Sequence, residues 1–281
     1  GDFQRDHYAG RNFHFGVREH AMTAILNGLC LSKLRAYGSG FFIFSDYAKP
    51  AIRLSALMEL PALYVFTHDS IGVGEDGPTH QPVEQLLGLR AIPGLVTLRP
   101  ADANEIAEAW RVAISLHHVP TALVLSRQAV PTLDRTRYAP ASGLARGGYV
   151  LADAPGAGDP EVILIGTGSE VSLCVTAHEV LLTRGVRSRV VSLPSWELFD
   201  EQSDDYRESV LPSAVRARVS VEQATTLGWE RYVGAEGARI GMHTFGASAP
   251  LKDLQKKFGF APESVVEAAE KQLARFAGAG H

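Results

Sequence analysis

Short apolar runs alternate along the first half of the chain with segments whose apolar residues recur at helical spacing. The apolar runs predict four buried strands, at residues 37–47, 62–66, 95–98 and 121–125. The helical spacing predicts three helices, at residues 17–33, 48–60 and 102–117. Asp102, with Glu105 three residues later, is typical of a capping box at the start of the third helix. Strands that alternate with helices favour right-handed βαβ units and a parallel sheet.

The alternation resumes after a break in composition. Prolines and glycines are frequent between residues 130 and 160, so we place a domain boundary there. Beyond it, strands are predicted at residues 162–165, 188–193 and 216–221, and helices at residues 170–183, 229–235, 251–258 and 262–276. We therefore predict an α/β fold of two domains with mainly parallel sheets flanked by helices. The first domain spans residues 1–135, a linker spans 136–145, and a smaller second domain spans 146–281.

Composition excludes several classes of protein. The chain of 281 residues is 46% hydrophobic and 21% charged, which is an ordinary balance for a globular protein. A net charge of -4 argues against a protein that binds nucleic acid or an anionic membrane through its overall charge. No window approaches the roughly 18 apolar residues of a membrane-spanning helix. Cys30 and Cys174 lie in apolar helical patterns, which favours free thiols and a cytoplasmic location over a disulfide.

A long polar segment, residues 67–82, follows the strand at 62–66. It contains His68, Asp76 and His80 together with three glycines and two prolines. Ligands of an open parallel sheet bind at the carboxyl ends of strands, where this segment is expected to lie. The spacing of the three side chains suits no compact zinc site, so we assign no metal ligand in this chain. Two interpretations stay open for them: acid–base or hydroxyl-binding groups, and ordinary solvated loop residues.

Other candidate residues each have a functional and a structural interpretation. Arg127 follows the strand at 121–125 and is either a phosphate-binding group or a solvated strand end. Glu19 lies in a first helical turn, where a carboxylate either interacts with the helix dipole or exchanges a proton in a buried site. Phe41, Phe44 and Tyr47 recur every three residues and are either core residues or a stacking platform for a flat heterocycle.

The glycine-containing turn at residues 166–170 follows a predicted strand and opens a predicted helix. Such a turn can bind an anion at the helix N-terminus. However, an acid, Glu170, stands where the dinucleotide fingerprint has its third glycine. We interpret the segment as a tight turn between a strand and a helix.

Taken together, these segments resemble transketolase. The matching stretches are residues 14–22, 44–47, 67–82, 99–102 with Asn104 and Glu105, 126–128, 166–171 and 245–248. The 67–82 segment is highly specific, because related thiamine-diphosphate enzymes keep mainly its 76–80 part. The resemblance covers nearly the full chain. It implies a thiamine-diphosphate-binding fold followed by a transketolase C-terminal-like domain.

The resemblance implies transfer of a two-carbon ketol unit from a ketose phosphate to an aldose phosphate in the pentose phosphate pathway, with thiamine diphosphate as cofactor. Glu19 matches the catalytic glutamate that hydrogen-bonds the aminopyrimidine ring and promotes formation of the ylid. Phe44 matches the aromatic ring that stacks on the pyrimidine. Phe41 and Tyr47 match residues that line the same pocket.

The resemblance also implies how the sugar phosphates are bound. His68 and Asp76 match residues that contact the sugar hydroxyls. His80 matches a histidine near the substrate carbonyl and phosphate end, and we name it as a second catalytic residue. Arg127 matches a phosphate-binding arginine.

The chain departs from the family at its front. Family members hold the cofactor diphosphate through Mg²⁺ or Ca²⁺ with an N-terminal domain that carries a Gly-Asp-Gly motif, which this sequence lacks. The opening strand and helix of the pyrimidine-binding domain are also expected to be missing. Because the family's active site lies between two subunits, this chain is expected to supply half a site and to be inactive alone. We expect a homodimer of the full-length enzyme, or assembly with a missing N-terminal fragment or subunit.

Two alternatives differ from this interpretation. Another thiamine-diphosphate enzyme, such as deoxyxylulose-phosphate synthase, is disfavoured by the 68–70 and 126–128 segments. A non-catalytic interaction subunit with the family fold is disfavoured because a scaffold need not keep Glu19, Phe44, His80 and Arg127 together.

Overall fold

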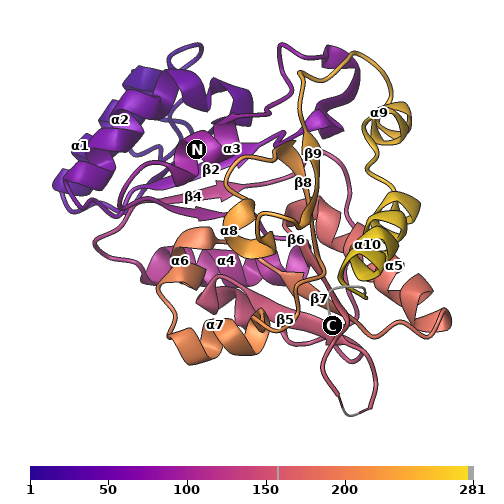
Figure 1. Cartoon of the computed structure of the whole chain (residues 1–281). Helices are drawn as coiled ribbons and strands as arrows, with labels where there is room; N and C mark the ends of the chain where they lie inside the picture. The colour runs from indigo at the N-terminus through magenta and orange to yellow at the C-terminus, as the bar shows by residue number, and fades with distance from the viewer. Residues whose placement is uncertain (157, 278–281) are drawn as a thin grey trace.

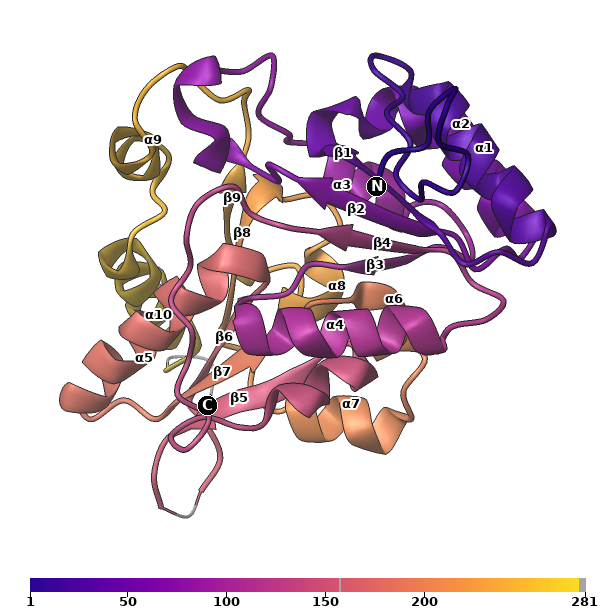
Figure 2. The ribbon, with the colours of Figure 1, turned by 180° about the vertical axis from the view of Figure 1, so that it is seen from behind.

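The computed structural model describes residues 1–156 and 158–277 (Figure 1). The first domain is built on a parallel sheet in the order β1-β2-β4-β3, whose four strands are labelled in the view from behind (Figure 2). Its strands are β1 (Tyr37–Phe41), β2 (Leu63–Thr67), β3 (Val96–Leu98) and β4 (Thr121–Val124). Its helices are α1 (Glu19–Leu31), α2 (Ser45–Leu57), α3 (Gln85–Arg90) and α4 (Ala103–Ser115). The predicted alternation of strand and helix is confirmed here.

The side chains of the first sheet alternate between two apolar clusters, as the period of two in a strand requires. Tyr64 and Phe66 of β2 pack in the cluster that α1, α2 and α3 cover. Leu63 and Leu123 pack in the cluster that α4 covers. The helix α4 therefore lies between the first sheet and the second, as the view from behind shows (Figure 2).

The predicted cap of α4 is present. The Asp102 carboxylate accepts a hydrogen bond from the Glu105 amide at 2.9 Å. The Glu105 carboxylate reaches back to the amide of Ala101 at 2.8 Å rather than to that of Asp102. The cap thus satisfies donors at the helix start that have no partner within the helix.

The second domain is built on a sheet in the order β5-β7-β6-β8-β9, parallel except for β5. Its strands are β5 (Tyr149–Asp153), β6 (Val162–Gly166), β7 (Ser188–Ser192), β8 (Arg218–Thr225) and β9 (Ala238–Met242). Its helices are α5 (Val171–Thr183), α6 (Trp196–Asp200), α7 (Asp204–Val210), α8 (Glu230–Val233), α9 (Leu251–Phe258) and α10 (Pro262–Ala277). One face packs against α5 and α10, and the other against α6, α7 and α8. The predicted two-domain α/β fold with mainly parallel sheets is confirmed.

One local prediction was wrong, and several short elements were not predicted. The aromatic strand predicted at 37–47 ends at Phe41, because the chain turns through the 3-10 helix η1 (Phe42–Phe44) and α2 begins at Ser45. The expected linker contains the 3-10 helix η3 (Ala141–Arg146), and its Leu144 is buried against α4. Sequence periodicity did not indicate β5, β9, α6 or α7. All four are short, so few residues carry a pattern.

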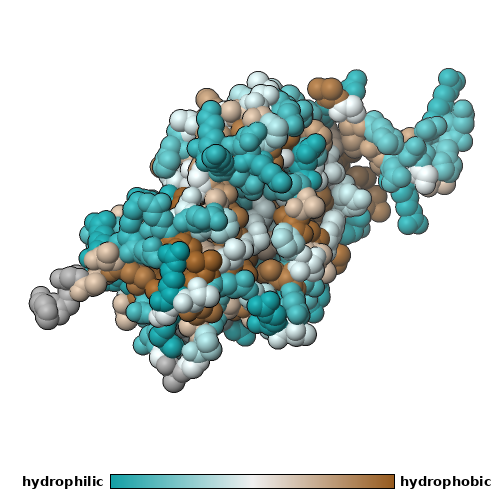
Figure 3. Space-filling view, turned by 90° about the vertical axis from the view of Figure 1, so that its right-hand side faces the viewer, coloured by the Kyte–Doolittle hydropathy of each residue, from teal (hydrophilic) through white to brown (hydrophobic). Residues whose placement is uncertain are grey.

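Hydrophilic residues cover most of the face seen in Figure 3, with smaller hydrophobic areas between them, as on an ordinary protein surface. Within the described ranges, none of the helices has the length and apolar character needed to cross a membrane.

Candidate active site

The carboxyl ends of β1, β2 and β4 lie at one edge of the first sheet. Phe41 pairs in register with Thr67, and Phe66 with Val124. His68 follows Thr67 directly, and Arg127 comes shortly after β4. Parallel register therefore brings these residues, far apart in sequence, to the edge where such sheets bind ligands.

Three aromatic rings form a shelf at this edge, which we call the aromatic shelf: Phe41, Phe44 and Tyr47. The rings of Phe41 and Phe44 are 6.4 Å apart between centroids and only 6° from parallel. Phe44 and Tyr47 are 6.3 Å apart. Because the strand ends at Phe41 and helical turns follow, the spacing of three residues places the rings on one side. Phe41 is 40% exposed and Tyr47 is 65% exposed, so the shelf is accessible to a ligand.

Two imidazoles stand against the aromatic shelf. The ring of His68 stacks on Phe41 with 3.7 Å between centroids, and that of His80 meets Phe44 edge-on at 5.7 Å. Nδ1 of each histidine is hydrogen-bonded to the hydroxyl oxygen of the threonine that precedes it, and the two atoms are 2.9 Å apart in both cases. In the described part of the chain, the Nε2 atom of each ring is left without a hydrogen-bond partner and is available to a ligand.

Charges of both signs surround His68. Burial lowers the pKa of His68, and the nearby Arg127 guanidinium lowers it further, whereas Asp76 and Asp69 act in the opposite direction. His68 is therefore neutral at neutral pH and can donate or accept a hydrogen bond. Arg127 and Asp76 are exposed, and neither forms an ion pair with another described residue. These two groups are thus free to meet a charged or hydroxylated ligand.

Glu19 is the first residue of α1 and is half-buried. Its carboxylate makes no hydrogen bond or ion pair within residues 1–156 and 158–277. Among the described residues, neither a hydrogen bond nor an aromatic contact joins it to the aromatic shelf, so its role in catalysis stays a prediction. Among the described residues, no three His, Cys, Asp or Glu side chains are grouped so that they can hold a metal ion.

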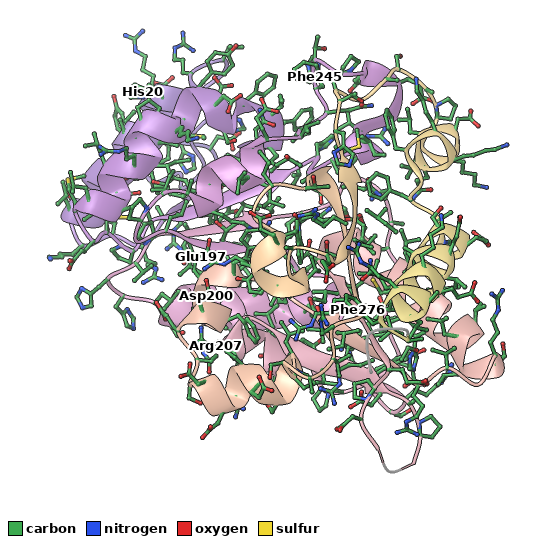
Figure 4. All side chains as sticks on the ribbon, viewed as in Figure 1. His20, Glu197, Asp200, Arg207, Phe245 and Phe276 are labelled. Carbon is green, nitrogen blue, oxygen red and sulfur yellow. The ribbon has the colours of Figure 1, made fainter. Side chains whose placement is uncertain are left out.

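Sequence reasoning missed a contact between the polar segment 67–82 and the second domain. The Gln81 amide nitrogen donates to the Gly74 carbonyl at 2.8 Å and to the Ala247 carbonyl at 2.9 Å. The Ser248 hydroxyl donates to the carbonyl of Glu75. The neighbouring Phe245 is 69% exposed and lies beside this segment (Figure 4). The 245–248 stretch resembles the family, but nothing in its sequence indicates this partner.

Two family models match the chain. The transketolase pyrimidine-binding domain matches residues 1–132, and the transketolase-like C-terminal domain matches residues 147–261. A transketolase from Halalkalibacterium halodurans is 53% identical over 97% of this chain. The chain spans 41% of the length of that relative.

Solved structures give the same picture. A transketolase from Leishmania mexicana superposes with a TM-score of 0.92 at 46% identity, covering 98% of this chain and 40% of the other. A Pichia stipitis transketolase in complex with sedoheptulose 7-phosphate superposes with a TM-score of 0.91 at 44% identity, and the match covers 99% of this chain and 40% of the other. A split-gene transketolase, described as an inactive β4 tetramer, shares the fold, with a TM-score of 0.79 at 24% identity. The match covers 97% of this chain and 88% of the other.

Proposed function

This chain belongs to the transketolase family, and from that premise we propose that it supplies the pyrimidine and substrate side of a site for two-carbon ketol transfer. The proposed donors are ketose phosphates and the proposed acceptors are aldose phosphates. The observation that carries the proposal is the aromatic shelf with two imidazoles against it, at 3.7 Å from Phe41 and 5.7 Å from Phe44. The Pichia stipitis relative crystallised with a sugar phosphate supports this substrate class.

The aromatic shelf fits the ring of thiamine diphosphate. Exposed, near-parallel aromatic faces suit a flat heterocycle, which is bound through dispersion and quadrupole interactions. When bound, thiamine diphosphate supplies the carbon nucleophile that takes up and releases the ketol unit. In our proposal, Phe41, Phe44 and Tyr47 hold the pyrimidine, and Glu19 hydrogen-bonds it. The Mg²⁺ or Ca²⁺ and the diphosphate are proposed to be held by a part of the enzyme outside this chain.

The polar residues at the shelf are proposed to bind the sugar. A neutral His68 and the free carboxylate of Asp76 suit neighbouring hydroxyl groups, which both donate and accept hydrogen bonds. His80, edge-on to Phe44, is proposed to meet the carbonyl end of the substrate. The exposed Arg127 offers a planar fork of donors to the phosphate. In our proposal, these groups together orient the sugar for transfer.

The complete site is proposed to need a second polypeptide segment, either from a homodimer of the full-length enzyme or from a separate N-terminal fragment or subunit. The split-gene relative supports the second form of assembly. We keep the domain limits of 1–135 and 146–281, and a cytoplasmic location, as proposals. The two cysteines, free and buried, suit a reducing compartment.

The 281-residue chain alone is expected to show no ketol transfer. Mixing it with the diphosphate-binding part of a transketolase, thiamine diphosphate and Mg²⁺ is expected to produce turnover, because the two halves then enclose one site. The assay is coupled spectrophotometric detection of the triose phosphate product. A mixture that binds thiamine diphosphate but transfers no two-carbon unit would contradict the proposed function.

Arg127→Ala in the complete enzyme is expected to raise KM for phosphorylated sugars by a factor on the order of 10 or more, because a charge-assisted hydrogen bond contributes about 1.5–3 kcal/mol. KM for the unphosphorylated analogues should change little. Arg137→Ala is the matched control, since Arg137 is also exposed and pairs with Glu179 at 2.9 Å on the second domain. An equal rise in KM for both kinds of sugar would remove Arg127 from the phosphate site.

A further inference from the structure

A buried arginine joins the two domains and pairs with the residue that follows His68. Arg99 follows β3, and its side chain is 1% exposed. It pairs with Asp69 of the first domain at 2.7 Å and with Glu170 of the second domain at 2.5 Å. Burial alone disfavours the guanidinium, but the carboxylates of Glu170, Asp69 and Glu222 raise the pKa of Arg99 above its ordinary value. Arg99 is therefore a charged group whose place is fixed by partners from both domains.

The turn at 166–170 is shaped to receive this arginine. Nη1 of Arg99 donates to the Thr167 carbonyl at 3.0 Å and to the Thr167 hydroxyl at 2.8 Å, while the Gly168 amide donates to the Arg99 carbonyl at 3.0 Å. Gly168 has φ +53°, and a Cβ there would fall 2.6 Å from Cζ of Arg99. The turn that resembled an anion site thus holds a cation of the same chain.

Asp69, the residue that follows His68, is held by two hydrogen bonds. Its carboxylate accepts hydrogen bonds from Nε of Arg99 at 2.9 Å and from the Ser70 hydroxyl at 2.9 Å. His68, one residue earlier, has a φ of 64°, in the left-handed region that non-glycine residues rarely adopt. Such a conformation costs on the order of 1–3 kcal/mol and persists only where the surroundings enforce it. The strand β2 fixes the chain before His68, and Asp69 fixes it after.

We propose that Arg99, with Asp69 and Glu170, is a positioning group that holds His68 in its left-handed conformation on Phe41. Through this group the second domain determines the geometry of the sugar-binding side of the site. The catalytic consequence rests on the proposed function, whereas the effect on the conformation of His68 does not.

Glu170→Gln in the complete enzyme tests the proposal, because it keeps the shape of the side chain and removes the charge opposite Arg99. We expect kcat/KM for a phosphorylated ketose to fall by a factor on the order of 10², since a displacement near 1 Å has this effect on an oriented site. KM itself should rise. A purely structural role would reduce the amount of folded enzyme, which lowers apparent kcat and leaves KM unchanged.

A double-mutant cycle with His68→Ala tests whether Glu170→Gln changes KM through His68. If Glu170 acts through His68, Glu170→Gln should change KM little once His68 is already Ala. Arg135→Gln is the matched control: Arg135 also joins the domains, through Asp102 at 2.9 Å and Tyr149 at 3.0 Å, but within the described residues it makes no hydrogen bond or ion pair with Asp69. Additive effects of Glu170→Gln and His68→Ala on KM would overturn the proposal. A rise in KM in Arg135→Gln equal to that in Glu170→Gln would overturn it as well.

A crystal structure of the variant separates this proposal from the proposed function. We expect the ring of His68 to leave Phe41 in Glu170→Gln, whether or not the enzyme transfers ketol units. A wild-type enzyme without transfer activity would refute only the proposed function, whereas a His68 unmoved in the variant would refute the positioning role. Arg99→Lys, which loses the fork toward Asp69, serves if Glu170→Gln does not fold. Failure of both to fold would assign the network a structural role and overturn the proposal.

Discussion

Glu19→Gln is expected to lower kcat of the complete enzyme by a factor on the order of 10²–10⁴, the usual contribution of a positioned proton-exchanging group. Glutamine keeps the size of the side chain but does not exchange a proton at the pyrimidine ring. Affinity for thiamine diphosphate should change much less than kcat, because the stacking surface proposed for the cofactor, the aromatic shelf, is unaltered. Steady-state turnover and a separate titration of cofactor binding by tryptophan fluorescence would measure the two effects.

The alternative role of Glu19, a partner of the helix dipole, has its own control. Glu263 is also an acid in the first turn of a helix, α10, and it is exposed and distant in sequence from the polar segment. A first-turn carboxylate contributes about 0.3–1 kcal/mol to stability through the dipole, and each substitution should cost a similar amount. Only Glu19→Gln should lose turnover. Equal, small changes in both variants would leave Glu19 with the dipole role alone.

Glu222→Gln is expected to reduce the free energy of unfolding by about 3–5 kcal/mol, because it leaves a buried arginine without its counter-charge. Arg90 of α3 donates to both oxygens of Glu222, at 2.9 and 2.8 Å, and the two side chains are 4% and 2% exposed. The hydroxyl of Thr167 and the indole nitrogen of Trp229 also donate hydrogen bonds to this carboxylate, at 2.7 and 2.9 Å. The midpoint of urea unfolding would measure the loss.

The control for this prediction is an exposed pair. Arg239 and Glu230 lie 3.8 Å apart with side chains 35% and 55% exposed, so Glu230→Gln should cost at most about 1 kcal/mol. Equal losses in the two variants would contradict the view that burial of the Arg90–Glu222 pair makes it sensitive to removal of one partner.

The pH dependence of the Glu222 effect has a definite sign. Burial opposes ionisation of Glu222, but Arg90, Arg99 and the hydrogen bond from Thr167 hold its pKa below the ordinary value of 4.5. An acid with a lowered folded-state pKa stabilises the protein above its unfolded pKa and loses that contribution as the pH falls through the folded value. The difference in the free energy of unfolding between wild type and Glu222→Gln should therefore have its largest value at pH 7 and should shrink below pH 4.5. A difference that grows on acidification would contradict this assignment.

Several elements were predictable because their signal is local. Residues 251–258 carry helical spacing, and α9 has these bounds. Asp102 stands directly before a helix and caps it. The convergence of His68 and Arg127 at one edge follows from the rule that parallel strands end together, whereas the place of Phe41 at that edge emerged only with the structure, which ends β1 at this residue. The roles of these residues in the reaction stay predictions.

The sequence alone therefore determined the two-domain α/β fold and the candidate residues that follow its predicted strands, because hydrophobic periodicity depends on neighbours in the chain. Only the tertiary structure decided that Arg99 pairs with Glu170, 71 residues later, and that Gln81 meets Ala247, 166 residues later. Such contacts leave no periodic pattern. They depend on how two separately packed sheets meet, and a buried charge selects its partner by proximity in space rather than by position in the chain.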